Sequence, residues 1–141
     1  MDVEGSVVLV TGANRGLGRA FTRELLAAGA AKVYAGARDP QSVTDPDVIP
    51  VALDVTDHAR VAALATELDD VTLVINNAGV GVGGTPLGIA SLDGVRQEFE
   101  VNALGTLAVS RAFAPVLEAN GGGALVNVLS ALSWVAFPSA S

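Results

Sequence analysis

The stretch SVVLVTGANRGLG occupies positions 6–18 and joins two kinds of pattern. Ser6–Val10 is a short run rich in β-branched residues, and the segment that follows the glycines places Leu17, Phe21 and Leu25 at helical spacing. The change of period predicts a strand, a glycine-rich turn and a helix, in that order. Glycines at such a junction adopt positive φ and let backbone N–H groups approach a pyrophosphate at the start of the helix. The stretch therefore indicates a nucleotide-binding loop.

The alternation of strand and helix continues along the rest of the chain. Gly29 supplies a helix stop, and the turn signal Arg38-Asp39-Pro40 follows the next apolar run. Strands are predicted over residues 6–10, 31–37, 48–53, 71–75 and 124–129, helices after Gly16, after Asp57 and from about residue 91 or 93 to Glu118, and a loop or poor helix over 41–47. Continuous apolar strands separated by helices indicate a parallel sheet buried on both faces. We predict a Rossmann-type, doubly wound parallel α/β fold with three layers, αβα.

The composition fits one globular domain over residues 1–141. Half of the residues are apolar and 16% are charged, so the chain has enough apolar surface for a core. A formal net charge of -7 without a Lys/Arg cluster argues against a nucleic-acid partner. No apolar run reaches the roughly 20 residues that span a bilayer, and the N-terminus does not open like a secretory signal, so we expect a cytoplasmic protein with no membrane partner. With no cysteine and one histidine, we expect no disulfide and no metal site.

The predicted fold lacks its usual last part. About twelve residues follow the fifth predicted strand, whereas a dinucleotide-binding fold of this type has six strands. The fifth strand would then be an uncovered apolar sheet edge, which folded proteins avoid. We therefore expect residues 1–141 to be the N-terminal, NAD(P)-binding part of a longer domain.

The glycine-rich turn belongs to a particular class of nucleotide-binding loop. It is not a P-loop, because no Gly-Lys-Ser/Thr follows it. Its spacing, Thr-Gly-x-x-x-Gly-x-Gly over residues 11–18, resembles that of the short-chain dehydrogenase/reductase family, and Asp54, Asn76-Asn77-Ala78-Gly79, Asn102 and Ser130 follow in the family's order. The resemblance covers essentially the whole chain. It implies reversible hydride transfer between C4 of a nicotinamide cofactor and a small-molecule carbonyl or alcohol substrate.

The resemblance also implies a set of cofactor-binding residues. The glycine-rich loop would hold the pyrophosphate, Asp54 would bind the adenine amino group, and the backbone of Val55 would contact the ring. The residues assigned to the cofactor are Thr11, Gly12, Asn14, Arg15, Gly16, Leu17, Gly18, Arg38, Asp54, Val55, Asn77, Ala78 and Gly79. For Asp54 the alternative is that it only ends a strand.

The end of the second predicted strand distinguishes NADP from NAD. A carboxylate that would hold the ribose 2′-hydroxyl of NAD is missing at Ala37-Arg38. Arg38 suits a 2′-phosphate instead, and Arg15 would close on it from the other side, because a guanidinium makes planar, bidentate contacts with phosphate. We predict NADP. NAD remains the alternative because Asp39 stands one residue after the position of the NAD-type acid.

Two residues are assigned to the catalytic centre. Asn102 lies inside the long helical pattern, an unfavourable place for asparagine unless its side chain or a local backbone distortion is used. It resembles the family's asparagine that holds a water in the proton relay. Ser130 matches the serine that hydrogen-bonds the substrate oxygen, with Ser133 as the nearby alternative.

The family's acid–base pair, Tyr-x-x-x-Lys, would begin one or two positions past Ser141. Tyr34 and Lys32 lie in the second predicted strand and do not fit this pair. The leading hypothesis is an NADP(H)-dependent oxidoreductase whose catalytic pair follows residue 141. The alternatives are a non-catalytic dinucleotide-binding or sensing protein, an inactive fragment without the pair, and an interaction domain, which would leave the motifs unexplained.

Family members commonly assemble through long helices. The apolar helix around Leu104, Leu107 and Phe113 would supply such a face. The resemblance therefore implies a homodimer or homotetramer.

Overall fold

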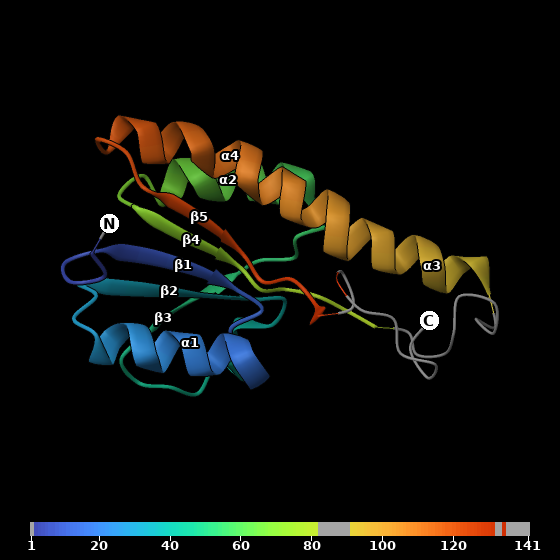
Figure 1. Ribbon diagram of the computed structural model, residues 1–141, viewed down its shortest axis with the longest axis horizontal. Helices are drawn as coiled ribbons and strands as arrows, with labels where there is room; N and C mark the ends of the chain where they lie inside the picture. The colour runs from blue at the N-terminus through green and yellow to red at the C-terminus, as the bar shows by residue number, and fades with distance from the viewer. Residues whose placement is uncertain (1, 82–90, 132–133, 135–141) are drawn as a thin grey trace.

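The computed structural model describes residues 2–81, 91–131 and 134 (Figure 1). The strands in this part of the chain are β1 (Val7–Thr11), β2 (Lys32–Ala37), β3 (Ile49–Ala52), β4 (Leu73–Asn76) and β5 (Ala124–Asn127). They form one parallel sheet in the order β3-β2-β1-β4-β5. The chain moves outward from β1 in one direction and then in the other, so the predicted doubly wound parallel fold is confirmed.

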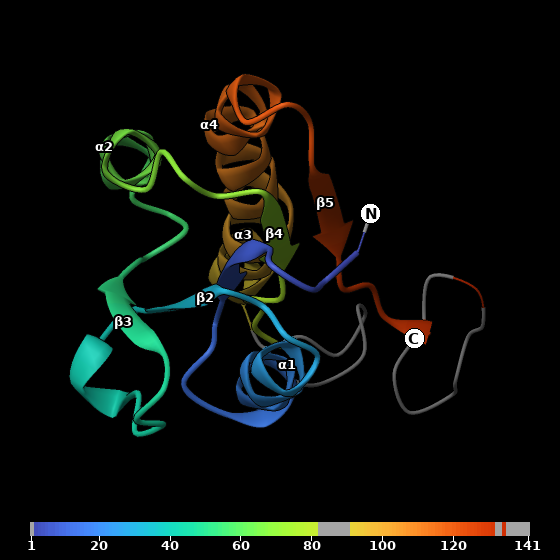
Figure 2. The same ribbon diagram turned by 90° about the vertical axis from the view of Figure 1, so that its left-hand side faces the viewer.

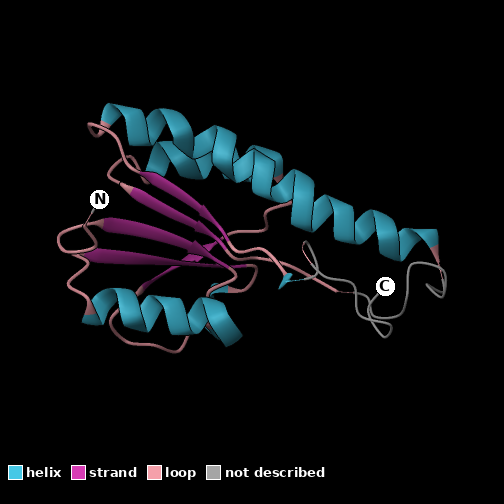
Figure 3. Ribbon diagram, viewed as in Figure 1, coloured by secondary structure: helices cyan, strands magenta, loops and turns pink. Residues whose placement is uncertain are grey.

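Helices cover both faces of the sheet. α1 (Gly16–Ala27) lies on one face, and α2 (His58–Glu67) and α4 (Thr106–Ala119) lie on the other (Figure 1, Figure 2). A short 3-10 helix, η1 (Pro40–Ser42), follows β2. α3 (Leu92–Phe99), the π-helical turn η2 (Glu100–Gly105) and α4 form one continuous helix that extends past the sheet (Figure 3). No helix of the described residues has the length and apolar character needed to cross a membrane.

The residues of β1 point alternately into two separate cores. Leu9 packs in the core under α2 and α4 together with Val74 and Phe113. Val8 and Val10 pack in the core under α1. All five side chains are 0% exposed. Burial on both faces explains why this strand is an uninterrupted apolar run and does not alternate between apolar and polar residues.

The limits of the strands differ slightly from those predicted. β1 covers 7–11 instead of 6–10, β2 begins at 32 instead of 31, β3 covers 49–52 instead of 48–53, β4 covers 73–76 instead of 71–75, and β5 ends at 127 instead of 129. Hydrogen-bonded pairing with neighbouring strands sets these limits, and an apolar run alone does not reveal it. Within the 41–47 segment, the first residues belong to η1.

The long helix buries one of the residues that we expected at an oligomer interface. Phe113 is 0% exposed, and with Val109 and Leu117 it forms the stripe of α4 that packs on the sheet. The expectation that Phe113 faces a partner is therefore wrong, because this part of the helix turns that stripe inward. Leu104 is half-buried, and Leu107 is 52% exposed.

Among the described residues, β5 forms an edge of the sheet. Its neighbour in the sheet is β4, and Leu125 and Val126 are 38% and 43% exposed. An apolar edge strand of this kind is a surface that folded proteins usually cover.

Candidate cofactor-binding site

A cleft of about 700 Å³ opens at the carboxyl end of the sheet, where open α/β sheets bind their ligands. Its walls come from the loops after β1, β2, β3 and β4 and from the helix around Gln97 to Val101. The residues assigned from the sequence that line it are Gly12, Asn14, Arg15, Gly16, Arg38, Asp54, Val55, Asn77, Ala78 and Gly79. Most of the predicted cofactor-binding set is thus brought together around one space.

Two glycines let the loop after β1 fold tightly against its surroundings. Gly12 has a φ of +66°, and a Cβ on it would lie 2.9 Å from the Cα of Ala78. A Cβ on Gly18 would lie 2.1 Å from the carbonyl oxygen of Gly12 and 2.5 Å from Nδ2 of Asn77. No side chain fits at either position, so this spacing of glycines follows from the close approach of α1, β1 and β4.

Thr11 and Asn77 lock the loop to the end of β4. The Thr11 hydroxyl accepts hydrogen bonds from the backbone N–H groups of Asn77 at 3.0 Å and Ala78 at 2.9 Å. The Asn77 side chain donates to the carbonyl oxygens of Thr11 at 3.0 Å and Gly12 at 3.2 Å. Thr11 is 1% exposed and lies behind the cleft wall, so its contribution is to hold the loop.

The N-terminus of α1 faces the cleft without a cap. Arg15 is its N-cap residue, with an extended φ of -157° and no capping hydrogen bond from its side chain, and the first turn carries no acidic residue. The first backbone N–H groups of a helix need partners, and the helix dipole makes this end favourable for an anion. Leu17 and Gly18 belong to this turn but do not line the cleft, and Leu17 is 65% exposed.

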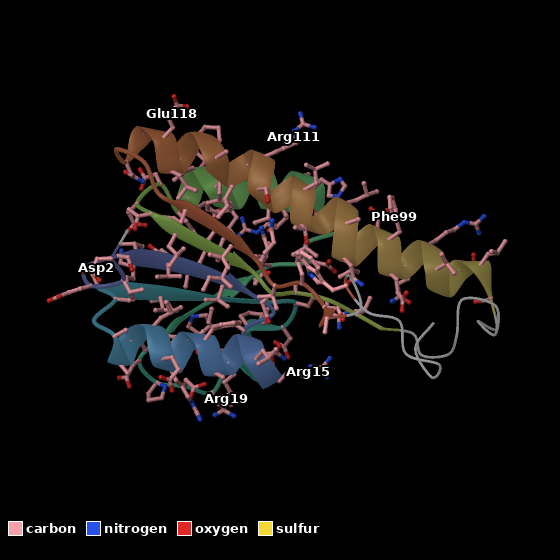
Figure 4. All side chains as sticks on the ribbon, in the orientation of Figure 1. Asp2, Arg15, Arg19, Phe99, Arg111 and Glu118 are labelled. Atoms are coloured by element: carbon pink, nitrogen blue, oxygen red, sulfur yellow. The ribbon has the colours of Figure 1, made fainter. Side chains whose placement is uncertain are left out.

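Two arginines border the cleft without a carboxylate partner. Arg15 and Arg38 form no salt bridge within the described residues, and both side chains are exposed. Figure 4 shows Arg15 at the start of α1 and Arg19 farther along the same helix. Arg19, unlike Arg15, is bound to Asp45, with its Nε 2.7 Å from the carboxylate. The cleft therefore has two cationic groups available for a ligand.

The side chain of Asp39 is used by its own turn. Its carboxylate accepts a hydrogen bond from the backbone N–H of Gln41 at 2.9 Å and caps η1. The Ser42 hydroxyl donates a hydrogen bond to the carbonyl oxygen of Asp39. Asp39 lines the cleft, but a ribose would compete with this cap for its carboxylate.

Asp54 presents a charged acceptor to the cleft. Its Oδ1 accepts hydrogen bonds from the backbone N–H of Thr56 at 3.0 Å and from the Thr56 hydroxyl at 2.7 Å. The backbone hydrogen bond from Thr56 is the main cause that lowers the pKa of Asp54; burial opposes it, and the Thr56 hydroxyl and the charge of Arg38 lower the pKa further. The carboxylate is therefore ionised at neutral pH and suited to accept from an amino group.

Asn102 lies in the π-helical turn η2, a backbone distortion that was one of the two possibilities left open by its place in the sequence. Its Oδ1 accepts from the backbone N–H of Val80 at 2.9 Å, and its Nδ2 donates to the Val80 carbonyl at 2.8 Å. Val80 lines the cleft, whereas Asn102 does not. The asparagine thus holds the segment after β4 in place along the cleft wall.

Ser130 lies three residues after the end of β5 and is exposed. It does not line the cleft. The competing Ser133 lies outside the described residues. The structure consequently brings together the predicted cofactor residues more fully than the predicted catalytic ones.

Several cleft residues were not found from the sequence: Ser42, Thr56, Val80, Gln97, Glu100 and Val101. Thr56 had a detectable signal, because a hydroxyl residue two positions after an aspartate is typical of a local turn. Val80 reaches the cleft through the path of the segment after β4, and the remaining four through the path of η1 and of the long helix, which no local pattern shows.

Comparison with known proteins identifies the family. A family model described as short chain dehydrogenase matches residues 6–141. The chain is 38% identical over 133 residues to the short chain dehydrogenase tazN of Aspergillus terreus, covering 83% of this chain and 29% of that protein. It is 38% identical over 134 residues to 1-deoxy-11-beta-hydroxypentalenate dehydrogenase of Streptomyces avermitilis, covering 86% of this chain and 50% of that protein.

A solved structure gives a similar result. A short chain dehydrogenase from Burkholderia cenocepacia, crystallised in complex with NADP, superposes with a TM-score of 0.92 at 48% identity and covers 99% of this chain. The chain spans 59% of the length of that protein and 29% to 50% of the two relatives above. The extent of the match and the motifs around the cleft show that the chain belongs to the short chain dehydrogenase family.

Proposed function

We propose that the protein is an NADP(H)-dependent oxidoreductase that transfers hydride between nicotinamide C4 and the carbonyl or alcohol carbon of a small molecule. In this proposal, residues 1–141 supply its dinucleotide-binding domain. The observation that carries it is one cleft that combines an uncapped helix N-terminus with two unpaired arginines. A dinucleotide with a 2′-phosphate has anionic groups for both. Family membership and the NADP complex of the 48% identical relative support the same cofactor.

The residues of the cleft divide between the parts of the cofactor. The backbone of residues 12–16 and the start of α1 bind the pyrophosphate, and Arg15 and Arg38 bind the 2′-phosphate from two sides. Asp54 accepts from the adenine amino group, with Val55 against the ring. The backbone of Asn77-Ala78-Gly79 passes along the ribose on the nicotinamide side. NADP(H) supplies the hydride donor or acceptor when it is bound.

The catalytic step needs a hydrogen-bond donor and an acid. Ser130 donates to the substrate oxygen and polarises the carbonyl, and Asn102 fixes the wall beside the reacting groups through Val80. Tyr34 does not supply the acid. It lies in β2 and does not line the cleft, and its hydroxyl donates a hydrogen bond to Asp70, which precedes β4. Proton transfer is assigned to a Tyr-x-x-x-Lys pair outside residues 1–141, in which the lysine lowers the pKa of the tyrosine.

The proposal includes a second copy of the chain as partner. Phe99 on α3 and Leu107 on α4 are 61% and 52% exposed on the long helix and replace the buried Phe113 as its apolar outer side chains. Association through these side chains would give a homodimer or homotetramer. Light scattering of the wild type and of Phe99→Glu tests this association. We expect a smaller particle for the variant.

Isothermal titration calorimetry with NADP+ and NAD+ tests the cofactor. The full-length protein is expected to bind NADP+ at least about tenfold more tightly than NAD+, the effect of one charge-assisted hydrogen bond. Equal affinities, or tighter binding of NAD+, would contradict the proposal that the protein recognises the 2′-phosphate of NADP+. Oxidation of NADPH with a panel of aldehydes and ketones then separates an oxidoreductase from a protein that only binds the dinucleotide.

A further inference from the structure

Asn76 is the last residue of β4 and lies beside the candidate site without lining the cleft. It is 5% exposed. Its Nδ2 donates hydrogen bonds to Oδ1 of Asn127 at 2.9 Å and to the Ser110 hydroxyl at 3.1 Å. Asn127 is the last residue of β5, and Ser110 lies in α4. One buried side chain therefore joins the ends of two strands to the helix that covers them.

The main chain of Asn76 holds the segment that leads to Ser130. Asn76 and Asn127 are the final paired residues of β4 and β5, and the backbone N–H of Val128 donates to the Asn76 carbonyl at 2.9 Å, one residue beyond the strand. β5 is an edge strand, and β4 is its neighbour in the described sheet. Ser130 comes two residues after Val128, so this bond holds the chain shortly before Ser130.

A second series of hydrogen bonds leads from Asn76 to Asn102. The Ser110 hydroxyl donates to the carbonyl oxygen of Thr106 at 2.8 Å, and the Thr106 hydroxyl donates to the carbonyl oxygen of Asn102 at 3.1 Å. These three residues follow one another at intervals of four, so they lie on one side of the continuous helix. The bond from the Asn76 amide to Ser110 thus continues along the helix to Asn102, and its bond to Asn127 holds the end of the strand that leads to Ser130.

The burial of Asn76 is not explained by packing. Its Oδ1 is buried and has no hydrogen-bond partner within the described residues. A buried polar atom without a partner is unfavourable, and an apolar side chain of similar size would avoid that cost. The benefit of asparagine at this position lies in the two bonds that its Nδ2 donates.

We propose that Asn76 is a positioning residue that holds the Ser130 segment and the Asn102 segment in a fixed relation. The inference rests on the proposed function, in which these two residues serve one substrate. Asn76 touches neither the cofactor nor the substrate. Its removal lets the two segments move independently, and a displacement of the order of 1 Å lowers the rate of the chemical step far more than the affinity for the cofactor.

Asn120 offers a matched control for Asn76→Ala. Its Nδ2 also donates two hydrogen bonds, to the carbonyl oxygens of Asp69 at 2.7 Å and Val71 at 3.1 Å. These bonds join the end of α4 to the chain just before β4, at the opposite end of the sheet from the cleft. Asn120→Ala therefore also removes two side-chain hydrogen bonds between separate elements, without touching the proposed link.

Hydrogen exchange of the full-length protein tests the link without requiring activity. Asn76→Ala is expected to speed amide exchange by about fivefold or more in both 102–106 and 128–130, because local opening no longer breaks the buried bonds. Asn120→Ala leaves both segments protected. Faster exchange in only one segment, or the same pattern in both variants, would overturn the proposal.

Steady-state kinetics with NADPH and a carbonyl substrate test the consequence. For Asn76→Ala, kcat is expected to fall by about tenfold or more while the Kd of NADPH stays within about twofold. Asn120→Ala changes neither quantity. A kcat that stays at the wild-type value in Asn76→Ala would show a structural role only and overturn the inference.

Ser110→Ala keeps the inference testable if Asn76→Ala does not fold. It breaks the link to the helix and leaves the bond between Asn76 and Asn127, so exchange should rise in 102–106 and stay unchanged in 128–130. The reverse pattern would contradict the proposed route. If both segments respond in Asn76→Ala but the wild type reduces no carbonyl with NADPH, the proposed function fails and the positioning role stands.

Discussion

The charged side chains at the two ends of the sheet differ in whether they form salt bridges. At the amino end, Lys32 at the start of β2 is paired with Asp70, which precedes β4, and the Tyr34 hydroxyl donates to the same carboxylate at 3.1 Å. At the carboxyl end, Arg15 and Arg38 border the cleft and form no salt bridge within the described residues, although the charge of Arg38 acts on the nearby Asp54. One end uses its charges to connect elements of the fold, and the other leaves them for a ligand.

A third cluster makes the same distinction along a single helix. Arg19 and Arg23 of α1 both bind Asp45 at 2.7 Å, and their hydrogen bonds lower the pKa of its carboxyl against the effect of burial. Arg15 lies at the N-terminus of the same helix and has no such partner in the described chain. Pairing by a carboxylate, more than the presence of arginine, separates the residues that stabilise the fold from those available to bind an anion.

Gly18→Val should have the largest effect at the cleft. The added side chain would collide with the Gly12 carbonyl oxygen, which lies 2.1 Å from the position of a Cβ. The loop would have to move, and we expect the affinity for NADP+ to fall by about 100-fold or more together with a loss of stability. Calorimetry and urea unfolding measure both effects.

Gly16→Ala is the control for this change. A Cβ on Gly16 meets nothing within 4 Å, and only its φ of +53° opposes a side chain. It should therefore cost about 1 kcal/mol of stability, less than Gly18→Val, in urea unfolding. Similar losses of stability in the two variants would mean that the close approach at Gly18 is unimportant.

Arg38→Ala separates the two cofactors. Loss of a guanidinium that binds the 2′-phosphate should weaken NADP+ by about 10- to 100-fold, from charge-assisted bonds of about 1.5–3 kcal/mol, and leave NAD+ nearly unchanged. Arg111→Ala, on the outer side of α4 (Figure 4), should change neither affinity. Equal weakening of both dinucleotides by Arg38→Ala would contradict a contact with the 2′-phosphate.

Asp70→Asn tests the amino end of the sheet. The variant keeps a hydrogen-bond acceptor but loses the charge opposite Lys32, so we expect the free energy of unfolding to fall by about 1 kcal/mol, as is usual for a partly exposed ion pair. The affinity for NADP+ should not change. A weaker cofactor affinity in this variant would show that the two ends of the sheet are coupled.

Acid pH should produce the smallest effect at the amino end. Burial raises the pKa of Asp70, but the hydrogen bonds from Lys32 and Tyr34 lower it more, so its pKa in the folded protein lies below the ordinary value. The stabilisation is then present above about pH 4, the unfolded value, and is lost as the pH falls through the folded pKa. The difference in stability between wild type and Asp70→Asn should shrink over this range. A difference in stability that grows on acidification would contradict a lowered pKa of Asp70 in the folded protein.

The residues that could be predicted from the sequence are those whose role is local. The strand, glycine turn and helix around Gly12 and Gly18 are contiguous in the sequence, so their spacing was enough to predict the loop. Arg38 was predicted from its place at the end of the next strand, and it lines the same cleft. Asn102 was also informative, because an asparagine inside a long helix is unfavourable unless its side chain or a backbone distortion is used, and the structure shows both.

The sequence was less informative about residues whose position depends on the tertiary path of the chain. Phe113 was expected on an outer face, but helical periodicity does not say which apolar stripe of a helix lies on the sheet. Ser42 and Glu100 reach the cleft because of the course of η1 and η2, which no motif encodes. The network of Asn76, Ser110 and Asn127 joins residues up to 51 positions apart, and only the folded chain brings them together.

A crystal structure of the full-length protein with NADP+ is the most direct test of the central claim that the unpaired cations of the cleft bind the 2′-phosphate. We expect the 2′-phosphate between the guanidinium groups of Arg15 and Arg38, with the pyrophosphate at the N-terminus of α1 and Asp39 still capping η1. A 2′-phosphate directed to solvent, with the ribose held by Asp39 instead, would contradict it.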